Sequence, residues 1–267
     1  MNYDGYTTIL VEKTADMVAT ITINRPEALN SFNRKMCLEF HDVWQKVRED
    51  KDVNAIVVRG APGRAFCAGV DVRDPDSPKV MMYDDVFAKV NPGEFLGPKQ
   101  HRLWKPVIVA VHGICAGGAF YWLNDADIVI CSEDATFFDP HCTFGMVASV
   151  EPVGLRHLVP AQEVLRMVLL GNDERICAAT ALRISLVTEV VKLENLWARA
   201  HELAAKIAAK PSVAVQGSVR AIWESMDLGR TIGLQMSLSY MLACDDGGTL
   251  EVDRNAVMGK AQPFEVR

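Results

Sequence analysis

The sequence predicts an α/β protein in which parallel strands alternate with helices, followed by a helical C-terminal region. Two continuously apolar segments, Lys105–Val111 and Ala126–Cys131, have the character of buried strands. A glycine-rich element and a short helix are expected between them, and this order is typical of parallel βαβ units. After Pro160 the apolar residues recur mostly at helical spacing.

The first sixty residues predict two strands, a helix and a third strand. Thr8–Lys13 and Val18–Ile23 alternate as strands do. Asn24-Arg25-Pro26 ends the second strand, because proline cannot donate a ladder hydrogen bond and restricts the residue before it. Asn33–Glu49 carries apolar residues at the spacing of an amphipathic helix, and Ala55-Ile56-Val57-Val58 indicates a short buried strand.

The pattern weakens between Asp71 and Gln100, where prolines and glycines surround one short helix expected near Met81–Val90. The helices expected further along the chain are Ala161–Leu170, Ala178–Ile184, Leu196–Lys210, Ser212–Ser225 and Gly233–Cys244. We expect a core over residues 1–195 and a C-terminal helical region over residues 196–267.

Composition predicts a soluble globular protein, with 49% hydrophobic and 23% charged residues. The net charge of −6 disfavours nucleic acid as a partner. Seven cysteines without a CxxC pair suit reduced thiols in the cytoplasm, and the first residues do not have the pattern of a secretory signal. The longest apolar run, Val107–Leu123, is short of the ~20 residues that span a bilayer and is broken by His112. We therefore expect a cytoplasmic location and no membrane partner.

Four segments carry the candidate chemistry. They are Asn24–Asn30, Gly63–Asp71, Lys105–Gly113 running into Ala116-Gly117-Gly118, and Ala135–Pro140. In this order they resemble the crotonase (enoyl-CoA hydratase/isomerase) superfamily. The resemblance implies stacked ββα turns forming a spiral, an acyl-CoA substrate, and C-terminal helices that build a homotrimer or a dimer of trimers.

The glycines of these segments suit an oxyanion hole. A thioester enolate needs two convergent N–H donors aimed where negative charge develops. Glycine lets a backbone approach a ligand closely, and a helix that begins there adds the positive end of its dipole. By resemblance, the donors are the backbone N–H groups of Val70 and Gly118. The alternative is that Gly117-Gly118 only forms a tight strand-to-helix turn, but the segment Ala65–Asp71 favours the oxyanion hole.

The resemblance also implies a groove for coenzyme A, formed largely by backbone groups. Its expected residues are Ala28, Leu29, Ala65, Ala68, Gly69, Asp71, Val72 and Gly117. Asn24–Asn30 also suits a turn and helix cap, and both interpretations can hold together. No Walker or dinucleotide-binding spacing is present, so we expect no cofactor beyond the coenzyme A of the substrate, and no metal.

Two positions depart from the family pattern. Hydratases of the family place two glutamates where this chain has Tyr121 and His141. Water addition by two glutamates is therefore not supported. Histidine can give or take a proton at neutral pH, and a Pro-His here is similar to β-diketone hydrolases of the superfamily. Glu151 is the nearest acid downstream, and we expect it to orient the His141 ring.

Several alternatives stay open from the sequence. Tyr121 also fits aromatic packing, and Asp139 is interpreted as a structural residue at a strand end. The preferred function is an acyl-CoA enzyme that stabilises a thioester enolate. The alternatives are a C–C bond hydrolase that uses His141, an isomerase with a single base, and a non-catalytic CoA-ester binding protein. The acyl group is not determined by any motif.

Overall fold

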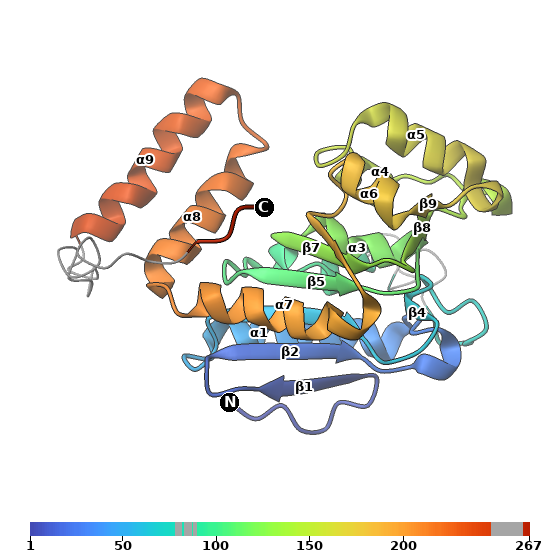
Figure 1. Ribbon diagram of the computed structural model, residues 1–267, viewed down its shortest axis with the longest axis horizontal. Coiled ribbons are helices and arrows are strands. Elements are labelled where there is room, and N and C mark those ends of the chain that lie inside the picture. Colours follow the sequence, from blue (N-terminus) through green and yellow to red (C-terminus); the bar gives the residue numbers. More distant parts are fainter. Residues whose placement is uncertain (78–81, 83–86, 88–89, 247–263) are drawn as a thin grey trace. The chain divides into compact units, whose positions relative to one another are not determined.

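Two β-sheets and the helices around them form the first of two units into which the chain divides (Figure 1). The computed structural model describes residues 1–77, 82, 87, 90–246 and 264–267. The units are Met1–Ala209 and Lys210–Arg267. All of the residues expected in the functional site lie in the first unit.

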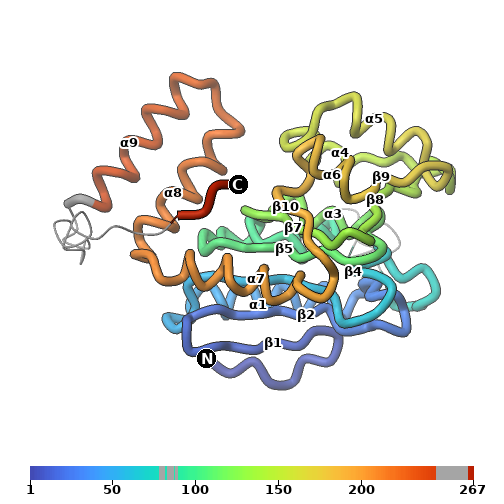
Figure 2. The backbone as a smooth tube through the Cα atoms, viewed as in Figure 1, coloured from blue at the N-terminus to red at the C-terminus, as the bar shows by residue number. Residues whose placement is uncertain are grey.

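The larger sheet has six strands, in the order β1-β2-β3-β5-β7-β10. Their bounds are β1 Ile9–Lys13, β2 Val18–Ile23, β3 Ala55–Gly60, β5 Val107–Val111, β7 Ile128–Ser132 and β10 Glu189–Val191. Only the β1–β2 pair is antiparallel; the other described pairs of this sheet are parallel. Figure 2 shows β10 beside β7. Continuous burial along β3 and β5 fits strands that are covered on both faces.

The smaller sheet has four short strands, in the order β4-β6-β8-β9. Their bounds are β4 Ala65–Cys67, β6 Ile114–Ala116, β8 Thr136–Phe138 and β9 Ile176–Cys177. β4, β6 and β8 are parallel to one another. Each follows a strand of the larger sheet, so that β3 leads to β4, β5 to β6 and β7 to β8. This succession of strand pairs is the ββα spiral that the resemblance implied.

Helices cover both faces of the larger sheet (Figure 1). α1 (Arg34–Glu49) buries Phe40 and Trp44 in one core cluster. α7 (Leu193–Ala208) buries a line of small residues in a second cluster, against the alternate side chains of β3 and β5. Because this helix covers the sheet, it belongs to the first unit. The expected division at residue 196 falls inside α7, and the second compact unit begins at Lys210.

Short helices connect the strands and carry much of the candidate site. They are η1 Pro26–Ala28, α2 Gly93–Leu96, η2 Lys99–His101, η3 Gly117–Ala119, α3 Phe120–Asn124, η4 Cys142–Phe144, α4 Val150–Leu155, α5 Ala161–Leu170, η5 Gly171–Asp173 and α6 Ala178–Arg183. α5 matches its expected range, and α6 ends one residue early. The helix expected near Met81–Val90 falls largely outside the described residues.

The second unit contains the helix pair α8 (Ser212–Ser225) and α9 (Arg230–Asp246). Glu224 links them, because it pairs with Arg220 on its own helix and accepts a hydrogen bond from Tyr240 on α9. The sequence predicted both helices, with α9 beginning three residues earlier than expected. Among the described helices, none is long and apolar enough to cross a membrane.

Candidate active site

Three parallel strands of the smaller sheet end where the candidate residues begin. Val70 follows β4, Gly118 follows β6 and His141 follows β8. The ends of neighbouring parallel strands lie at the same edge of a sheet. The fold therefore gathers these three residues, which are far apart in the sequence, at one edge.

The backbone of Val70 is held in extended form by Phe32. Phe32 N–H donates to Gly69 O at 2.9 Å, and Asp71 N–H donates to Phe32 O at 2.8 Å, which makes a parallel bridge between Phe32 and Val70. Successive amides of an extended chain point to opposite sides. The N–H of Val70 is therefore directed away from Phe32, on the side opposite to this bridge.

Gly118 lies at the start of a helical segment, against the turn at Gly69. It is the second residue of η3, and the N–H groups at the start of a helix have no partner within that helix. A Cβ on Gly69, whose φ is +89°, would lie 3.4 Å from Gly118 N and 3.0 Å from Ala116 O. The two glycine turns are thus in close contact, which is the arrangement that two convergent N–H donors require.

The expected coenzyme A groove combines two segments that adjoin in the structure. Ala68 N–H donates to Leu29 O at 3.1 Å, so the segment with Ala28 lies beside the segment from Ala65 to Val72. Val72 is 86% exposed. The carboxylate of Asp71 pairs with Arg25 at 2.8 Å, so it anchors the Asn24–Asn30 turn beside the segment from Ala65 to Val72.

His141 lies beside the glycine turn. Its ring Nδ1 is 2.7 Å from Oδ1 of Asp139, and its backbone N–H donates to the same oxygen at 2.9 Å. The ring atom Cε1 is 3.8 Å from the position that a Cβ on Gly117 would occupy. The hydrogen bond to Asp139 raises the pKa of His141, whereas burial lowers it and the charge of Glu151 adds to the increase.

Tyr121 packs against the same glycine turn. Its ring atom Cε2 is 3.3 Å from the Cβ position of Gly118, and its Cδ1 is 2.6 Å from that of Gly93. Both glycines therefore make room for the ring. Burial raises the pKa of Tyr121, and the charge of Glu151 raises it further. The phenol consequently stays protonated and can donate a hydrogen bond or a proton, but it is not available as a base.

Glu151 is buried, with 6% of its surface exposed, at the first turn of α4. Its backbone oxygen accepts a hydrogen bond of 2.8 Å from Asn124 Nδ2, which ties α4 to α3. Its charge acts on both Tyr121 and His141. The group that accepts the hydrogen bond from His141 Nδ1, however, is Asp139 and not the expected Glu151. A carboxylate-bound imidazole and a neutral phenol thus lie beside the glycine turn, and the charge of a buried acid acts on both. Groups of this kind can transfer protons.

Sequence reasoning did not assign Asp139 a part in this site. Its side chain is completely buried, and the bond to His141 bridges only two positions along the chain. The signal in the sequence is the spacing Asp-Pro-His, which places a carboxylate where it can reach a histidine ring two residues on. Asn91 was also missed; its Oδ1 lies near the Tyr121 ring, at 2.9 Å from the Cβ position of Gly93.

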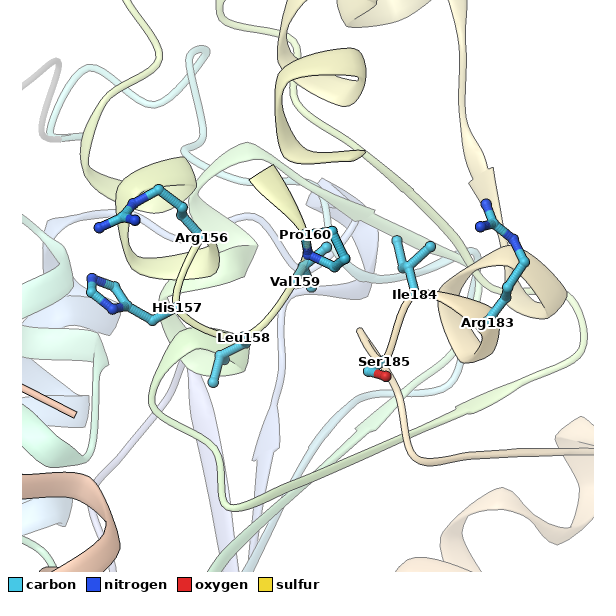
Figure 3. A pocket seen from close by; sticks show the side chains of 8 residues that line it. All are labelled: Arg156, His157, Leu158, Val159, Pro160, Arg183, Ile184 and Ser185. Atoms are coloured by element: carbon cyan, nitrogen blue, oxygen red, sulfur yellow. The ribbon is translucent and has the colours of Figure 1, made fainter. Parts of the chain in front are cut away.

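A surface pocket of about 390 Å³ lies elsewhere in the first unit, and Figure 3 shows its lining side chains. Arg156 and Arg183 stand at opposite ends of it, with Pro160 and Ile184 between them (Figure 3). None of the expected site residues lines this pocket. The candidate site is therefore defined by the glycine turns and the side chains around them.

Comparisons with known proteins show the family and the fold of the chain. The model of the enoyl-CoA hydratase/isomerase family matches residues 13–242. The chain is 30% identical to (E)-benzylidenesuccinyl-CoA hydratase of Thauera aromatica over 84% of both chains. It is 32% identical to the mitochondrial Delta(3,5)-Delta(2,4)-dienoyl-CoA isomerase of Mus musculus, over 89% of this chain and 74% of the relative. The crystal structure of an enoyl-CoA hydratase/isomerase from Mycobacterium paratuberculosis has a TM-score of 0.84 and 33% identity, covering 98% of this chain and 100% of that one.

Proposed function

Because the chain belongs to the enoyl-CoA hydratase/isomerase family of the crotonase superfamily, we propose that it forms the enolate of an acyl-CoA thioester, with His141 as the proton-transferring group. The observation that carries this proposal is the His141 ring, bound to a buried carboxylate and placed beside Gly117. The coenzyme A belongs to the substrate, and no other cofactor enters the proposal.

The thioester oxygen is proposed to accept hydrogen bonds from the N–H groups of Val70 and Gly118. Support comes from the contact between the Gly69 and Gly117-Gly118 turns and from the direction of the Val70 amide. Donors that are fixed before the reaction stabilise the developing charge without reorganising. Loss of one such donor typically costs ~2.7–4 kcal/mol of transition-state stabilisation.

In this proposal His141 removes a proton from the carbon next to the thioester carbonyl and returns it to the same or another carbon. A buried carboxylate on Nδ1 makes the ring a stronger base. Tyr121, which remains protonated, donates a hydrogen bond or a proton to the acyl group. Glu151 adds negative charge behind both groups.

A second candidate is hydrolysis of a C–C bond in a β-dicarbonyl substrate, which the carboxylate–imidazole pair of Asp139 and His141 favours. His141 would take a proton from water while the hydroxide adds to a carbonyl carbon. The C–C bond then breaks, one fragment leaves as a carboxylate, and the enolate of the other takes the proton.

The test is exchange of the proton next to the thioester in D2O. A panel of saturated acyl-CoA esters is incubated with the protein, and deuterium uptake is followed by mass spectrometry. We expect uptake with the native protein and a loss of ~100-fold or more in His141→Ala. His157→Ala, at an exposed histidine of the surface pocket, is the matched control and should behave as the native protein.

Other outcomes distinguish the remaining candidates. Undiminished exchange in His141→Ala would remove His141 from the mechanism. Hydration of crotonyl-CoA would place the protein with the hydratases. Cleavage of acetoacetyl-CoA to acetate and acetyl-CoA, or a gain of one water mass by a cyclic β-diketone on ring opening, would identify the hydrolase. Binding of the esters with neither exchange nor turnover would make it a CoA-ester binding protein.

We further propose assembly as a homotrimer or a dimer of trimers through the second unit. In that unit α8 buries no residue, and Ile222, Leu234 and Leu238 are exposed apolar side chains. Sedimentation equilibrium tests this proposal, and a monomer at micromolar concentration would contradict it.

A further inference from the structure

Asp139 is placed in an unusual environment for a turn residue. Its side chain has no exposed surface, and Oδ1 accepts from both the backbone and the ring of His141. Oδ2 is buried and has no hydrogen-bond partner among the described residues. A carboxylate that is buried and only half satisfied is unfavourable unless a neighbour benefits from its charge.

Turn formation alone does not explain this carboxylate. Acceptance of the His141 N–H by an oxygen two residues earlier is an Asx-turn, which asparagine forms as well as aspartate. The turn therefore needs the oxygen but not the negative charge. The ring of His141, at 2.7 Å, is the group on which the charge acts.

The geometry points to Asp139 as a positioning residue for His141: its buried carboxylate accepts the Nδ1 proton of the ring and leaves Nε2 as the nitrogen that takes a proton. In a neutral imidazole, one nitrogen donates and the other accepts, so a partner that only accepts selects the tautomer. The catalytic role that we infer for Asp139 rests on the proposed function. The tautomer of the His141 ring does not depend on that function.

The ring is also held in position. Nδ1 is fixed by Asp139, and the adjoining Cε1 lies against Gly117. Nε2 is the next atom along that ring edge. A Cβ at Gly117 would come 3.8 Å from Cε1 and 3.4 Å from Pro140 Cδ, which are ordinary van der Waals distances, so the ring lies near the turn without clashing. Rotation of the ring about its χ angles would break the bond to Asp139.

Among the residues that the structure describes, the two charges that act on His141 are both negative. Asp139 comes from the end of β8 and Glu151 from the first turn of α4, and both raise the pKa of the ring against the effect of burial. Tyr121, on α3, is a protonated phenol near Glu151 and adds no charge. The effects of the two carboxylates on His141 can be distinguished by experiment. Asp139 forms a hydrogen bond with the ring, whereas Glu151 acts on it through its charge.

The experiment is an NMR titration of the native protein with 15N-labelled histidine. The signals of His141 are assigned by their absence in His141→Ala. The expected native result is a neutral ring protonated on Nδ1, with a pKa above the ordinary ~6.5. A native ring protonated mainly on Nε2 would overturn the inference without any variant.

Variants then distinguish the hydrogen bond from Nδ1 to Asp139 from the effect of negative charge alone. Asp139→Asn should lower the pKa of His141 by about one unit or more, and Glu151→Gln should lower it while the ring stays protonated on Nδ1. Asp139→Glu should restore part of the shift. Asp173→Asn, at an exposed aspartate of η5, is the control. An unchanged pKa and tautomer in Asp139→Asn would overturn the positioning role.

Kinetics link the result to function. In the native protein the rate of deuterium exchange should rise with pH through the pKa of His141, and in Asp139→Asn this rise should move to lower pH, with a lower kcat and a KM changed less than about threefold. A pH profile that does not move in Asp139→Asn would contradict the inference. Failure of the native protein to exchange would count against the proposed function, whereas the NMR result would still decide the role of Asp139.

Discussion

Phe32 connects the two proposed oxyanion donors: its backbone pairs with the Val70 segment, and its ring atom Cε1 lies 2.5 Å from where a Cβ on Gly118 would stand. The ring also packs against Tyr121 and Trp122, at centroid distances of 6.3 and 6.2 Å. A side chain at residue 118 must therefore displace an aromatic cluster together with the backbone that carries the other donor.

Gly118→Ala is expected to lower the rate of deuterium exchange by ~100-fold, because it disturbs both donors. Overpacking against Phe32 should also destabilise the fold by ~1–3 kcal/mol, as measured by urea unfolding. Gly229→Ala is the control, since a Cβ there would meet nothing within 4 Å. Native-like exchange in Gly118→Ala would argue against the oxyanion hole.

Tyr121→Phe removes a hydroxyl and keeps the ring that fills the space beside Gly93 and Gly118. We expect kcat to fall ~10–100-fold, because a phenol that stays protonated acts as a donor, while KM and stability change little. Steady-state kinetics and thermal unfolding check these expectations. Tyr6→Phe, which loses a surface hydrogen bond to Asp42, is the matched control. An unchanged kcat would show that the hydroxyl of Tyr121 takes no part in the reaction and that the ring serves only in packing.

Lys105 is a buried lysine whose side-chain amine caps backbone carbonyls at the C-terminal end of α1. It is 5% exposed, and Nζ donates to Val47 O at 2.7 Å and to Asp50 O at 2.6 Å. Lys105→Met should remove both bonds, leaving Asp50 O with only its 3.2 Å bond from Val53 N–H, and lower the free energy of unfolding by ~2–4 kcal/mol. Lys51→Met, at the exposed lysine next to Asp50, should change it by less than ~0.5 kcal/mol.

The same lysine predicts a pH dependence. Burial lowers its pKa from 10.5 to about 8. Between these values the unfolded chain holds the proton and the folded chain does not, so the contribution of Lys105 to stability increases as pH rises. The difference in unfolding free energy between the native protein and Lys105→Met should therefore widen from pH 8 towards pH 10.5. A difference that narrows would show that the folded protein keeps the amine charged.

Asn30 anchors the turn that carries Leu29. It is 1% exposed at a φ of +54°, its Nδ2 donates to Ala65 O at 2.8 Å, and its Oδ1 accepts from Arg25 N–H at 3.0 Å. Asn30→Ala should cost ~3–5 kcal/mol, because it loses these bonds and strains a left-handed residue. Asn30→Gly loses the bonds without the strain and should be ~1 kcal/mol less destabilised in urea unfolding. Equal losses would mean that the side-chain bonds account for the whole effect.

The larger sheet and the long helices could be predicted because their periodicity extends over enough residues. β1 runs over Ile9–Lys13 and β2 over Val18–Ile23, close to their expected ranges, and α8 begins and ends as expected. β4, β6 and β8 have three residues each, too few to show a period of two. The resemblance implied the spiral to which they belong, whereas the residues alone did not indicate them.

The candidate site was predicted as a set of residues but not as a set of contacts. The sequence could place Val70, Gly118 and His141 near one another through the family pattern. It expected Glu151 to orient the His141 ring and interpreted Asp139 as a structural residue, whereas the fold shows that Asp139 is the acid that reaches Nδ1. The catalytic roles themselves stay predictions until the exchange experiment is done.

Each successive layer of the spiral contributes one part of the site at the end of a strand of the smaller sheet. The layers ending in β4 and β6 supply Val70 and Gly118, and the layer ending in β8 supplies Asp139 and His141. In the proposed function, the two oxyanion donors and the Asp139–His141 pair therefore come from separate, consecutive layers. In the proposed function, substitutions at Asp139 and His141 in the third layer would change the proton-transferring pair and leave the backbone donors of the first two layers in place.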